Sequence, residues 1–300
     1  MSHEREQRVV FLSAVRTGFG AFGGTLRSHS ATDLGAIATQ CALARSGVTS
    51  DEIDHVIFGN VVQTSTDAAY LARHIGLSAG LPIEVPAVTV NRLCGSGFEA
   101  IIQGAHRILL GEAKAVVAGG TESMTQAPYV LRGARFGTKL GQAPVLEDSL
   151  WDSLRDTYCG LPMGDTAENL GKQYGVTRAD ADAYALSSQQ RAKSAWEAGA
   201  FRQEVIPVAV RNPKTGTTTE WVADEHMRPD STAEGLAKLP PVFRKDGLVT
   251  AGNASGVSDG AAAVVLADER WAAERGLRPL GRLIAWAVSG VDPALMGIGP

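Results

Sequence analysis

The strongest chemical signal in the sequence is a cysteine between glycines. Its segment reads Asn91-Arg92-Leu93-Cys94-Gly95-Ser96-Gly97, after an apolar stretch and before a helical pattern. A cysteine at a helix start lies beside unpaired N–H groups and the positive end of the helix dipole, which favour the anionic thiolate. Thiolate is the reactive form, and the two glycines leave space for a substrate. The pattern therefore indicates a nucleophile, and the alternative is a small buried hydrophobic cysteine.

A second glycine-rich segment, Gly18-Phe19-Gly20-Ala21-Phe22-Gly23, has the spacing of the dinucleotide-binding fingerprint. That function requires a helix opening at the last glycine and an acidic residue at the end of the next strand. Here the next helical pattern begins only near Ser30, and the next strand pattern ends in Gly59-Asn60-Val61 without an acid. A plain turn is therefore favoured over a nucleotide site.

The remaining cysteines and histidines indicate no second site. Cys41 lies on the apolar face of a helical pattern, and Cys159 lies in an irregular stretch. Three scattered cysteines form no disulfide framework, and no Cys-x-x-Cys or His-x-x-x-His pair suggests zinc. We assign no catalytic base among the six histidines, which are His3, His29, His55, His74, His106 and His226.

Composition bounds the possible functions. The 300 residues are 44% hydrophobic and carry a net charge of −4, so nucleic acid is an unexpected partner. No apolar run approaches the roughly 20 residues that cross a bilayer. The first seven residues are polar and lack the apolar core of a signal peptide. We therefore expect a soluble, cytoplasmic protein with no membrane association.

The first 120 residues alternate strand and helix patterns. Strands are expected at 8–13, 54–62, 87–91 and 115–118, and helices at 31–47, 67–77 and 94–111. This alternation predicts right-handed βαβ units and a mostly parallel sheet covered on both faces. Cys94 then lies where a strand turns into a helix.

The pattern changes after Gly120. Residues 121–249 are richer in polar residues and contain two strong helical patterns, near 165–175 and at 178–198. Strand and turn patterns return at 248–267, followed by a helix at 268–276 and a strand at 280–289. The expected domains are an α/β core half (1–120 plus 250–269), a loop domain (121–249) and the start of a second core half (270–300).

The segment around Cys94 resembles the nucleophile motif of thiolases, and further segments resemble that family in the same order. They are Arg16-Thr17 with Phe22-Gly23-Gly24, Gly119-Gly120-Thr121-Glu122-Ser123-Met124, Met163-Gly164-Asp165-Thr166-Ala167-Glu168-Asn169, Thr250-Ala251-Gly252-Asn253-Ala254-Ser255-Gly256 with Asp259-Gly260-Ala261-Ala262, and Gly290-Val291-Asp292-Pro293 with Met296-Gly297-Ile298-Gly299-Pro300. The resemblance covers nearly the whole chain past residue 8. It implies a thiolase-like α/β fold, in which each core half is βαβαβαββ and a loop domain is inserted.

The resemblance also implies a reaction. Cys94 would take an acyl group from a coenzyme A thioester, in acetoacetyl-CoA synthesis or in 3-ketoacyl-CoA thiolysis, a step of fatty acid metabolism. Coenzyme A is a substrate, and no metal or redox cofactor is implied. By analogy, Arg228 would lie against the nucleotide end of CoA, Ser255 would hydrogen-bond the pantetheine chain, Met163 would line its pocket, and Met296 would border the catalytic cavity. Without the resemblance, Arg228 is read as a solvated surface charge and Ser255 as a turn residue.

Two departures from the family pattern matter. Pro162-Met163-Gly164 stands where many short-chain members carry His-Met-Gly, which weakens specificity for acetoacetyl-CoA. The later family motifs, with an Asn, the His of Gly-His-Pro and a second Cys, do not occur in this sequence. We therefore expect a piece of a longer protein, with the second core half largely missing and catalysis incomplete.

Alternatives to a thiolase stay open at this point. One is a ketoacyl synthase-like condensing enzyme, although its nucleophile motif usually has small residues before the Cys and serines after it. Another is a non-catalytic CoA-binding relative. The resemblance further implies a homodimer or homotetramer, with residues 129–150 as a contact arm.

Overall fold

The computed structural model describes residues 8–299, which form two compact units. The polar start of the chain, with His3, lies outside the described residues. Unit 1 runs from residue 8 to Gln126 and adds Phe201–Glu225 and Ser258–Ala287. Unit 2 consists of Ala127–Ala200, His226–Val257 and the residues from Val288 onward.

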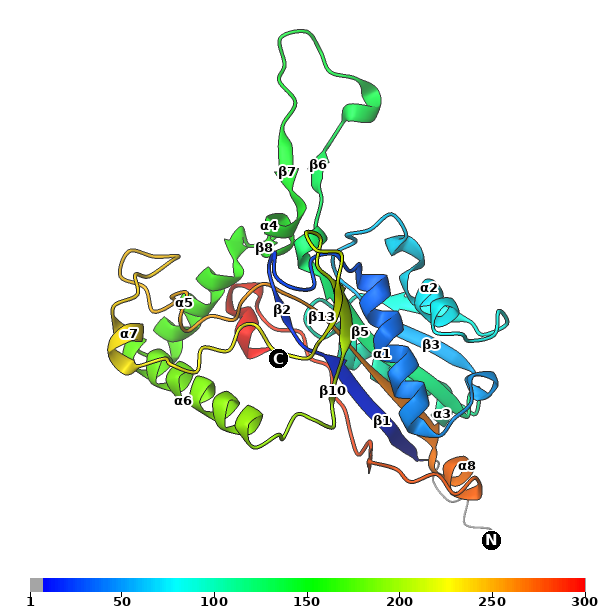
Figure 1. Cartoon of the computed structure of the whole chain (residues 1–300). Coiled ribbons are helices and arrows are strands. Elements are labelled where there is room, and N and C mark those ends of the chain that lie inside the picture. Colours follow the sequence, from blue (N-terminus) through cyan, green and yellow to red (C-terminus); the bar gives the residue numbers. More distant parts are fainter. Residues whose placement is uncertain (1–7, 300) are drawn as a thin grey trace. The chain divides into compact units, whose positions relative to one another are not determined.

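Unit 1 is built on one mixed sheet (Figure 1). Its main strands, in spatial order, are β10 (Val205–Ile206), β1 (Val9–Thr17), β13 (Ser258–Asp268), β5 (Ala115–Ser123), β3 (His55–Gly59) and β4 (Ala87–Val90). Two short strands pair with it off this path, β2 (Gly20–Ala21) with β13 and β14 (Gly281–Arg282) with β1. Five of the six main strands run in the same direction, which agrees with the expected mostly parallel sheet. β13 is the exception, because it runs antiparallel to both of its neighbours, β1 and β5.

Helices cover both faces of this sheet. They are α1 (Ala31–Ser46), α2 (Leu71–Ser78), α3 (Ser96–Leu109) and α8 (Glu269–Glu274), with short 3₁₀ turns η1 (Ser50–Glu52), η2 (Ala68–Tyr70) and η3 (Met124–Gln126). Local signals define α1: Ser30 and Asp33 form a capping box at its start, and Gly47 ends it in the left-handed conformation. The main elements thus follow the order βαβαβαββ, which confirms the predicted fold of the core half.

The core of unit 1 lies on the two faces of the sheet. In β3, the side chains of Val56 and Phe58 belong to one buried cluster together with α1 and α2. Ile57 points to the other face and packs with Ala100, Ala105 and Ile108 of α3. This alternation follows from the two-residue repeat of a strand. The sheet therefore buries side chains on both faces, and α3 packs against β3 and β5 on one of them.

Unit 2 is mostly helical, with short hairpins. Its helices are α4 (Ser149–Ser153), α5 (Met163–Tyr174), α6 (Arg178–Glu197) and α7 (Ala233–Ala237), with 3₁₀ turns η4 (Ala134–Phe136) and η5 (Pro293–Ile298). β6 (Tyr129–Leu131) pairs with β7 (Leu146–Asp148), and β8 (Arg155–Asp156) with β9 (Leu161–Pro162). The two strong helices are those that the sequence predicts. The residues between β6 and β7 form a long arm that extends away from α4 (Figure 1).

The unit boundaries differ from the expected domains. Phe201–Glu225, which we placed in the loop domain, belongs to unit 1, where β11 (Val208–Arg211) pairs with β12 (Thr218–Trp221). The reason is a set of long-range contacts: β10 pairs with β1, and Arg16 binds both Glu204 and Asp224 at 2.8 Å. The expected strand at 280–289 is reduced to the two residues of β14. Within residues 8–299, no helix is long and apolar enough to span a membrane.

Candidate active site

Cys94 lies in the turn between β4 and α3. The helix begins two residues later, at Ser96, with Gly95 as its N-cap, so the cysteine precedes the first helical turn. Its side chain is exposed, unlike that of an inert core cysteine. The preceding residue, Leu93, has a φ of 49°, a left-handed conformation that is costly for a branched residue and recurs at functional turns. The turn therefore presents the sulfur outward at a helix start.

Short-range hydrogen bonds hold this turn in place. The Ser96 hydroxyl accepts from the backbone N–H of Arg92 at 2.9 Å and donates to the carbonyl of Leu93 at 2.6 Å. The side chain of Asn91 accepts from the Leu93 N–H at 2.9 Å. Because both sides of Cys94 are fixed in this way, its position does not depend on a bond to its own side chain.

An ion pair ties the same turn to α3. Arg92 donates from Nε to the buried carboxylate of Glu99 at 2.6 Å. Burial opposes ionisation of Glu99, but hydrogen bonds from Arg92 and Gln103 outweigh it and lower its pKa. The carboxylate is therefore charged at neutral pH, and it anchors the residue two positions before the cysteine.

Glycines let the strand ends approach the start of α3. A Cβ added to Gly59, the last residue of β3, would lie 2.5 Å from the carbonyl carbon of Ser96. A Cβ on Gly120 would lie 3.4 Å from the Cα of Gly97. The backbone of the nucleophile turn thus rests directly on β3, which leaves no space for a side chain at Gly59, and it lies within ordinary van der Waals contact of β5 at Gly120.

Glu122, near the end of β5, organises the loop that follows β3. Its carboxylate accepts from the N–H groups of Val61 and Val62 at 3.0 and 3.2 Å, and from Nδ2 of Asn60 at 2.8 Å. Burial raises the pKa of Glu122, and the hydrogen bonds only partly offset that effect. Glu122 therefore holds the loop directly after Gly59, the residue whose backbone approaches Ser96.

The glycine-rich segment at residues 18–23 is a turn, as the sequence predicts. Its N–H groups are occupied by acidic side chains of unit 1: Phe19 donates to Asp224 at 2.8 Å, and Ala21 donates to Glu225 at 2.7 Å. Gly23 donates to the hydroxyl of Thr125 at 2.9 Å. No helix opens at the last glycine, since α1 begins at Ala31. Amides bound to carboxylates cannot cradle a pyrophosphate.

The residues assigned to CoA by resemblance lie in unit 2, whereas Cys94 lies in unit 1. Met163 is the first residue of α5 and Met296 lies in η5, and both are half-buried. These two elements pack against each other, and Nδ2 of Asn169 in α5 donates to the carbonyl of Ala294 in η5 at 3.0 Å. The structure therefore brings the two predicted methionines onto neighbouring elements.

Arg228 and Ser255 are both exposed and lie on segments that touch each other. The N–H of Arg228 donates to Oε1 of Gln189 at 2.7 Å, which ties its segment to α6. A Cβ added to Gly256, the residue after Ser255, would collide with the ring of His226. The two predicted CoA contacts are therefore presented by adjoining stretches of backbone.

The other candidates stay outside this chemistry. Cys41 packs against the core, and Cys159 lies in a turn between β8 and β9. His55 begins β3, and burial lowers its pKa, so it is neutral at pH 7. Within residues 8–299, no group of three or more His, Cys, Asp or Glu side chains is arranged to hold a metal ion.

Sequence reasoning assigned no role to Ser96, Gly59 or Glu122. Ser96 and Glu122 stood within quoted motifs, but nothing in the sequence indicates that their side chains bind the turns before α3 and after β3. In the sequence, Gly59 only marks the end of a strand pattern that lacks the acidic residue of a nucleotide site. A glycine at the end of a buried strand is the signal that could have pointed to a close backbone approach.

A βαβαβαββ unit with an exposed cysteine at a strand-to-helix turn has the features of an acyltransferase that uses a cysteine nucleophile. Residues 9–270 match the family model described as thiolase, N-terminal domain. The chain therefore belongs to the thiolase family, and it is an acyltransferase of the thiolase type.

Individual relatives agree with this assignment. Over 292 residues the chain is 53% identical to human mitochondrial 3-ketoacyl-CoA thiolase. The matched region covers 97% of this chain and 73% of the relative. It is 46% identical over 295 residues to the beta-ketothiolase BktB of Cupriavidus necator, covering 98% of this chain and 74% of the relative. The crystal structure of the human mitochondrial enzyme superposes with a TM-score of 0.94 at 53% identity, covering 98% of this chain and 74% of that chain. The chain thus spans about three quarters of the length of these relatives.

Proposed function

We propose that Cys94 is the nucleophile in thiolysis of 3-ketoacyl-CoA. The observation that carries this assignment is the exposed cysteine in a strained, cross-braced turn at the start of α3. Identity is higher to relatives named 3-ketoacyl-CoA thiolase, at 53%, than to the acetyl-CoA acetyltransferase of Pseudomonas aeruginosa, at 46%. Pro162 in place of the short-chain histidine favours the same substrate class. Relatives named for CoA substrates also support free CoA over a carrier protein.

The proposed reaction has two transfers. The Cys94 thiolate attacks the keto carbon of the substrate, and the bond between that carbon and its α-carbon breaks. The electron pair leaves with the α-carbon, which takes a proton and departs as acetyl-CoA, while the shortened acyl group remains as a thioester on Sγ. The thiolate of a second CoA attacks this thioester, so that a shortened acyl-CoA forms and the Cys94 thiolate is regenerated. Splitting one difficult displacement into two thioester exchanges is what a cysteine contributes.

We assign the CoA contacts to four residues of unit 2. A guanidinium is suited to phosphate and to stacking on adenine, so Arg228 takes the nucleotide end. Ser255 hydrogen-bonds the pantetheine chain, and Met163 and Met296 line the apolar part of the path. The exposure of Arg228 and Ser255 on adjoining segments supports this assignment. A related crystal structure, 52% identical, is that of human mitochondrial 3-ketoacyl-CoA thiolase in complex with CoA.

Three further properties belong to the proposal. The reaction needs no metal or redox cofactor, and activity that is unchanged by dialysis against a chelator is the expected result. The protein acts in the cytoplasm, although relatives at 53% identity are named mitochondrial, and fractionation of cells that make the tagged protein tests this. It forms a homodimer or homotetramer through the arm at 129–150, which exposes large apolar side chains such as Phe136. Light scattering of wild type and an arm variant tests the assembly.

Acyl trapping on the nucleophile tests the central claim. We expect radiolabelled acetyl-CoA to transfer its acetyl group to the protein, with peptide mapping placing the label on Cys94. Cys94→Ser abolishes the label, whereas Cys159→Ser, at a half-buried cysteine of unit 2, keeps it. Label that survives in Cys94→Ser overturns the assignment. CoA binding without any label supports a non-catalytic relative instead.

A further inference from the structure

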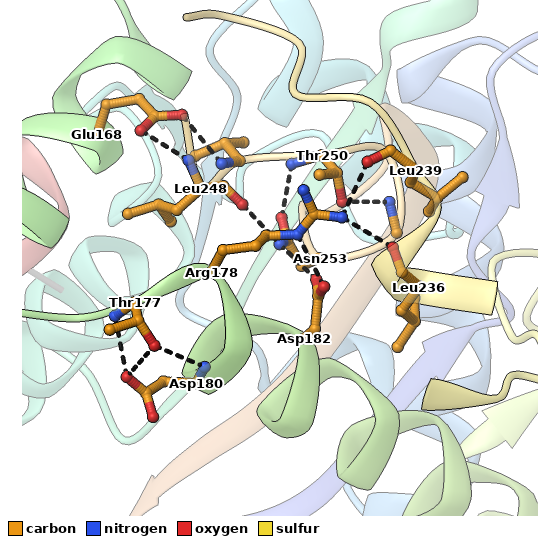
Figure 2. Close-up of polar contacts among 12 residues, drawn as sticks. Glu168, Thr177, Arg178, Asp180, Asp182, Leu236, Leu239, Leu248, Thr250 and Asn253 are labelled. Carbon is orange, nitrogen blue, oxygen red and sulfur yellow. Dashed lines mark hydrogen bonds and ion pairs between the residues drawn. The ribbon is translucent and has the colours of Figure 1, made fainter. Parts of the chain in front are cut away.

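A buried polar network at the start of α6 joins the two segments that carry Arg228 and Ser255 (Figure 2). Arg178, the first residue of α6, is its centre. The Nη2 atom of Arg178 donates to the carbonyl oxygens of Leu236 and Leu239 at 2.8 and 2.9 Å. Both leucines follow Arg228 in the chain, at the end of α7 and just beyond it. One guanidinium therefore fixes the backbone of the first segment.

Asp182 connects the same arginine to the second segment. One oxygen of its carboxylate, Oδ2, accepts from Nε of Arg178 at 2.7 Å, and the other, Oδ1, accepts from Nδ2 of Asn253 at 2.9 Å. Asn253 lies two residues before Ser255. Asp182 is buried, so each of its oxygens needs the partner that it has.

Asn253 in turn holds its own loop together. Its Nδ2 also donates to the carbonyl of Leu248 at 2.8 Å, and its Oδ1 accepts from the N–H of Thr250 at 2.7 Å. From the opposite side, Glu168 of α5 accepts from the N–H groups of Leu248 and Val249 at 3.0 and 2.9 Å. The residues before Ser255 are thus held by side chains of two helices.

The two segments also pack directly on each other. A Cβ added to Gly252 would collide with the side chains of Leu236 and Leu239, and one added to Gly256 would collide with His226. The two segments are therefore in direct contact, and the network links the backbone at Leu236 and Leu239 to the loop that precedes Ser255.

We propose that Arg178 and Asp182 are positioning residues for CoA: they set the separation of the segments that contact its nucleotide and pantetheine parts. This inference rests on the proposed CoA contacts of Arg228 and Ser255. In this proposal, neither Arg178 nor Asp182 touches CoA. Their effect is pre-organisation, because a loosened pair of segments must be ordered again when CoA binds, and that ordering weakens affinity.

Calorimetric titration of the whole chain with CoA tests the inference. We expect Asp182→Asn to raise the Kd for CoA at least tenfold, since an amide has one acceptor oxygen for two donors. We expect Arg178→Lys also to raise the Kd for CoA, because one ammonium group cannot reproduce a planar guanidinium that reaches a carboxylate and two carbonyls. If Asp182→Asn fails to fold, Arg178→Lys carries the test alone.

Thr177→Ala is the matched control. Thr177 and Asp180 form the capping box of α6, one residue from Arg178, and no hydrogen bond joins them to the network in Figure 2. The control destabilises the same helix but leaves the Kd within about twofold of wild type, the size expected without direct coupling. Hydrogen exchange across residues 248–257 rises in Asp182→Asn and not in Thr177→Ala.

The outcomes separate the two proposals. If wild type does not bind CoA, or Arg228→Ala binds it as tightly as wild type does, the proposed CoA contacts are wrong. If Arg228→Ala weakens binding while folded Asp182→Asn and Arg178→Lys bind as wild type, only the positioning role is overturned. Equal weakening by Thr177→Ala also overturns it, because general destabilisation of α6 then explains the loss.

Discussion

Unit 1 contains two glycine-rich turns of opposite character. In the turn at 18–25, backbone N–H groups of Phe19 and Ala21 are bound to carboxylates that come from 200 residues further along the chain. In the turn at 91–97, the N–H groups before the cysteine are bound by Asn91 and Ser96 of the same turn. The first turn is an attachment point for distant structure, whereas the second is self-contained and leaves Cys94 exposed.

This difference explains why spacing of glycines alone is a poor guide to function. Glycine spacing permits a tight turn, but the partners of the turn's N–H groups decide what it can bind. Around residues 18–25 those partners are acids, so an anionic ligand is excluded. At Cys94 the helix start remains accessible, as a nucleophile requires. Substitutions that act on only one of the two turns can sharpen this contrast.

The largest effect is expected from Gly59→Ala. The new Cβ would meet backbone atoms of Ser96, which cannot rotate away, so the turn or β3 must move. We expect a loss of about 3 kcal/mol in the free energy of unfolding, at the upper end for overpacking. Displacing the sulfur by about 1 Å also slows acetylation of Cys94 by about 100-fold. Urea unfolding and the rate of radiolabel incorporation measure the two effects.

Gly97→Ala provides the control for that substitution. Nothing lies within 4 Å of a Cβ at this position, which is within the first turn of α3. We expect a stability equal to wild type or higher by up to about 1 kcal/mol, because alanine is the better helix former. A Gly59→Ala protein as stable as Gly97→Ala would contradict the close approach of β3 and α3.

The next effect concerns the acid-bound turn. Glu225→Ala removes the acceptor of the Ala21 and Thr25 N–H groups, and of the Thr25 hydroxyl. We expect a loss of about 2 kcal/mol, since three donor groups on two half-buried residues lose their partner. Acetylation of Cys94 stays within about twofold of wild type, as for well-separated sites. Glu220→Ala, at an exposed carboxylate in β12, changes neither quantity; a tenfold slower acetylation in Glu225→Ala would show that the two turns are coupled.

A smaller loss is expected from Ser96→Ala. The change removes one hydroxyl that bonds Arg92 and Leu93, and it costs about 1.5 kcal/mol, near the value for one buried hydrogen bond and its unpaired partner. Because these bonds brace the turn on both sides of the sulfur, acetylation slows about tenfold. Ser96→Thr, which keeps the hydroxyl, recovers most of the rate. If Ser96→Ala reacts at the wild-type rate, the brace is irrelevant to reactivity.

The parts of this fold that the sequence predicts are those with local causes. The bounds of α1 and α6 follow from capping boxes at Ser30 and Thr177 and from a glycine at or just beyond the end of each helix, all within a few residues. The position of Cys94 before α3 follows from the change of an apolar strand pattern into a helical pattern at the glycines that follow the cysteine. For these elements, neighbours in sequence contain the required information.

The parts that could not be predicted depend on partners far away in the chain. The direction of β13 is decided by its pairing with β1 and β5. The apolar pattern of β13 does not indicate which strands it pairs with. The return of residues 201–225 to unit 1 depends on Arg16 and its two acids. The role of Glu122 likewise depends on a loop 60 residues earlier. The CoA contacts of Arg228 and Ser255 stay predictions.

The smallest expected effect is a pH dependence caused by Glu122. Burial raises its pKa in the folded protein, so the folded chain binds this proton more tightly than the unfolded chain does. The resulting stabilisation is complete below the ordinary glutamate pKa and is lost as the pH rises through the raised folded pKa. One proton limits the slope to about 1.4 kcal/mol per pH unit.

Glu122→Gln tests this linkage directly, because its amide has no proton to lose. We expect the free energy of unfolding of wild type to fall more steeply with rising pH, above the ordinary glutamate pKa, than that of Glu122→Gln. Urea unfolding at a series of pH values measures the difference between the two curves. Exposed Glu220→Gln keeps the wild-type slope. Parallel curves for wild type and Glu122→Gln would mean that Asn60, Val61 and Val62 compensate fully for burial, and the carboxylate would then be a purely structural acceptor.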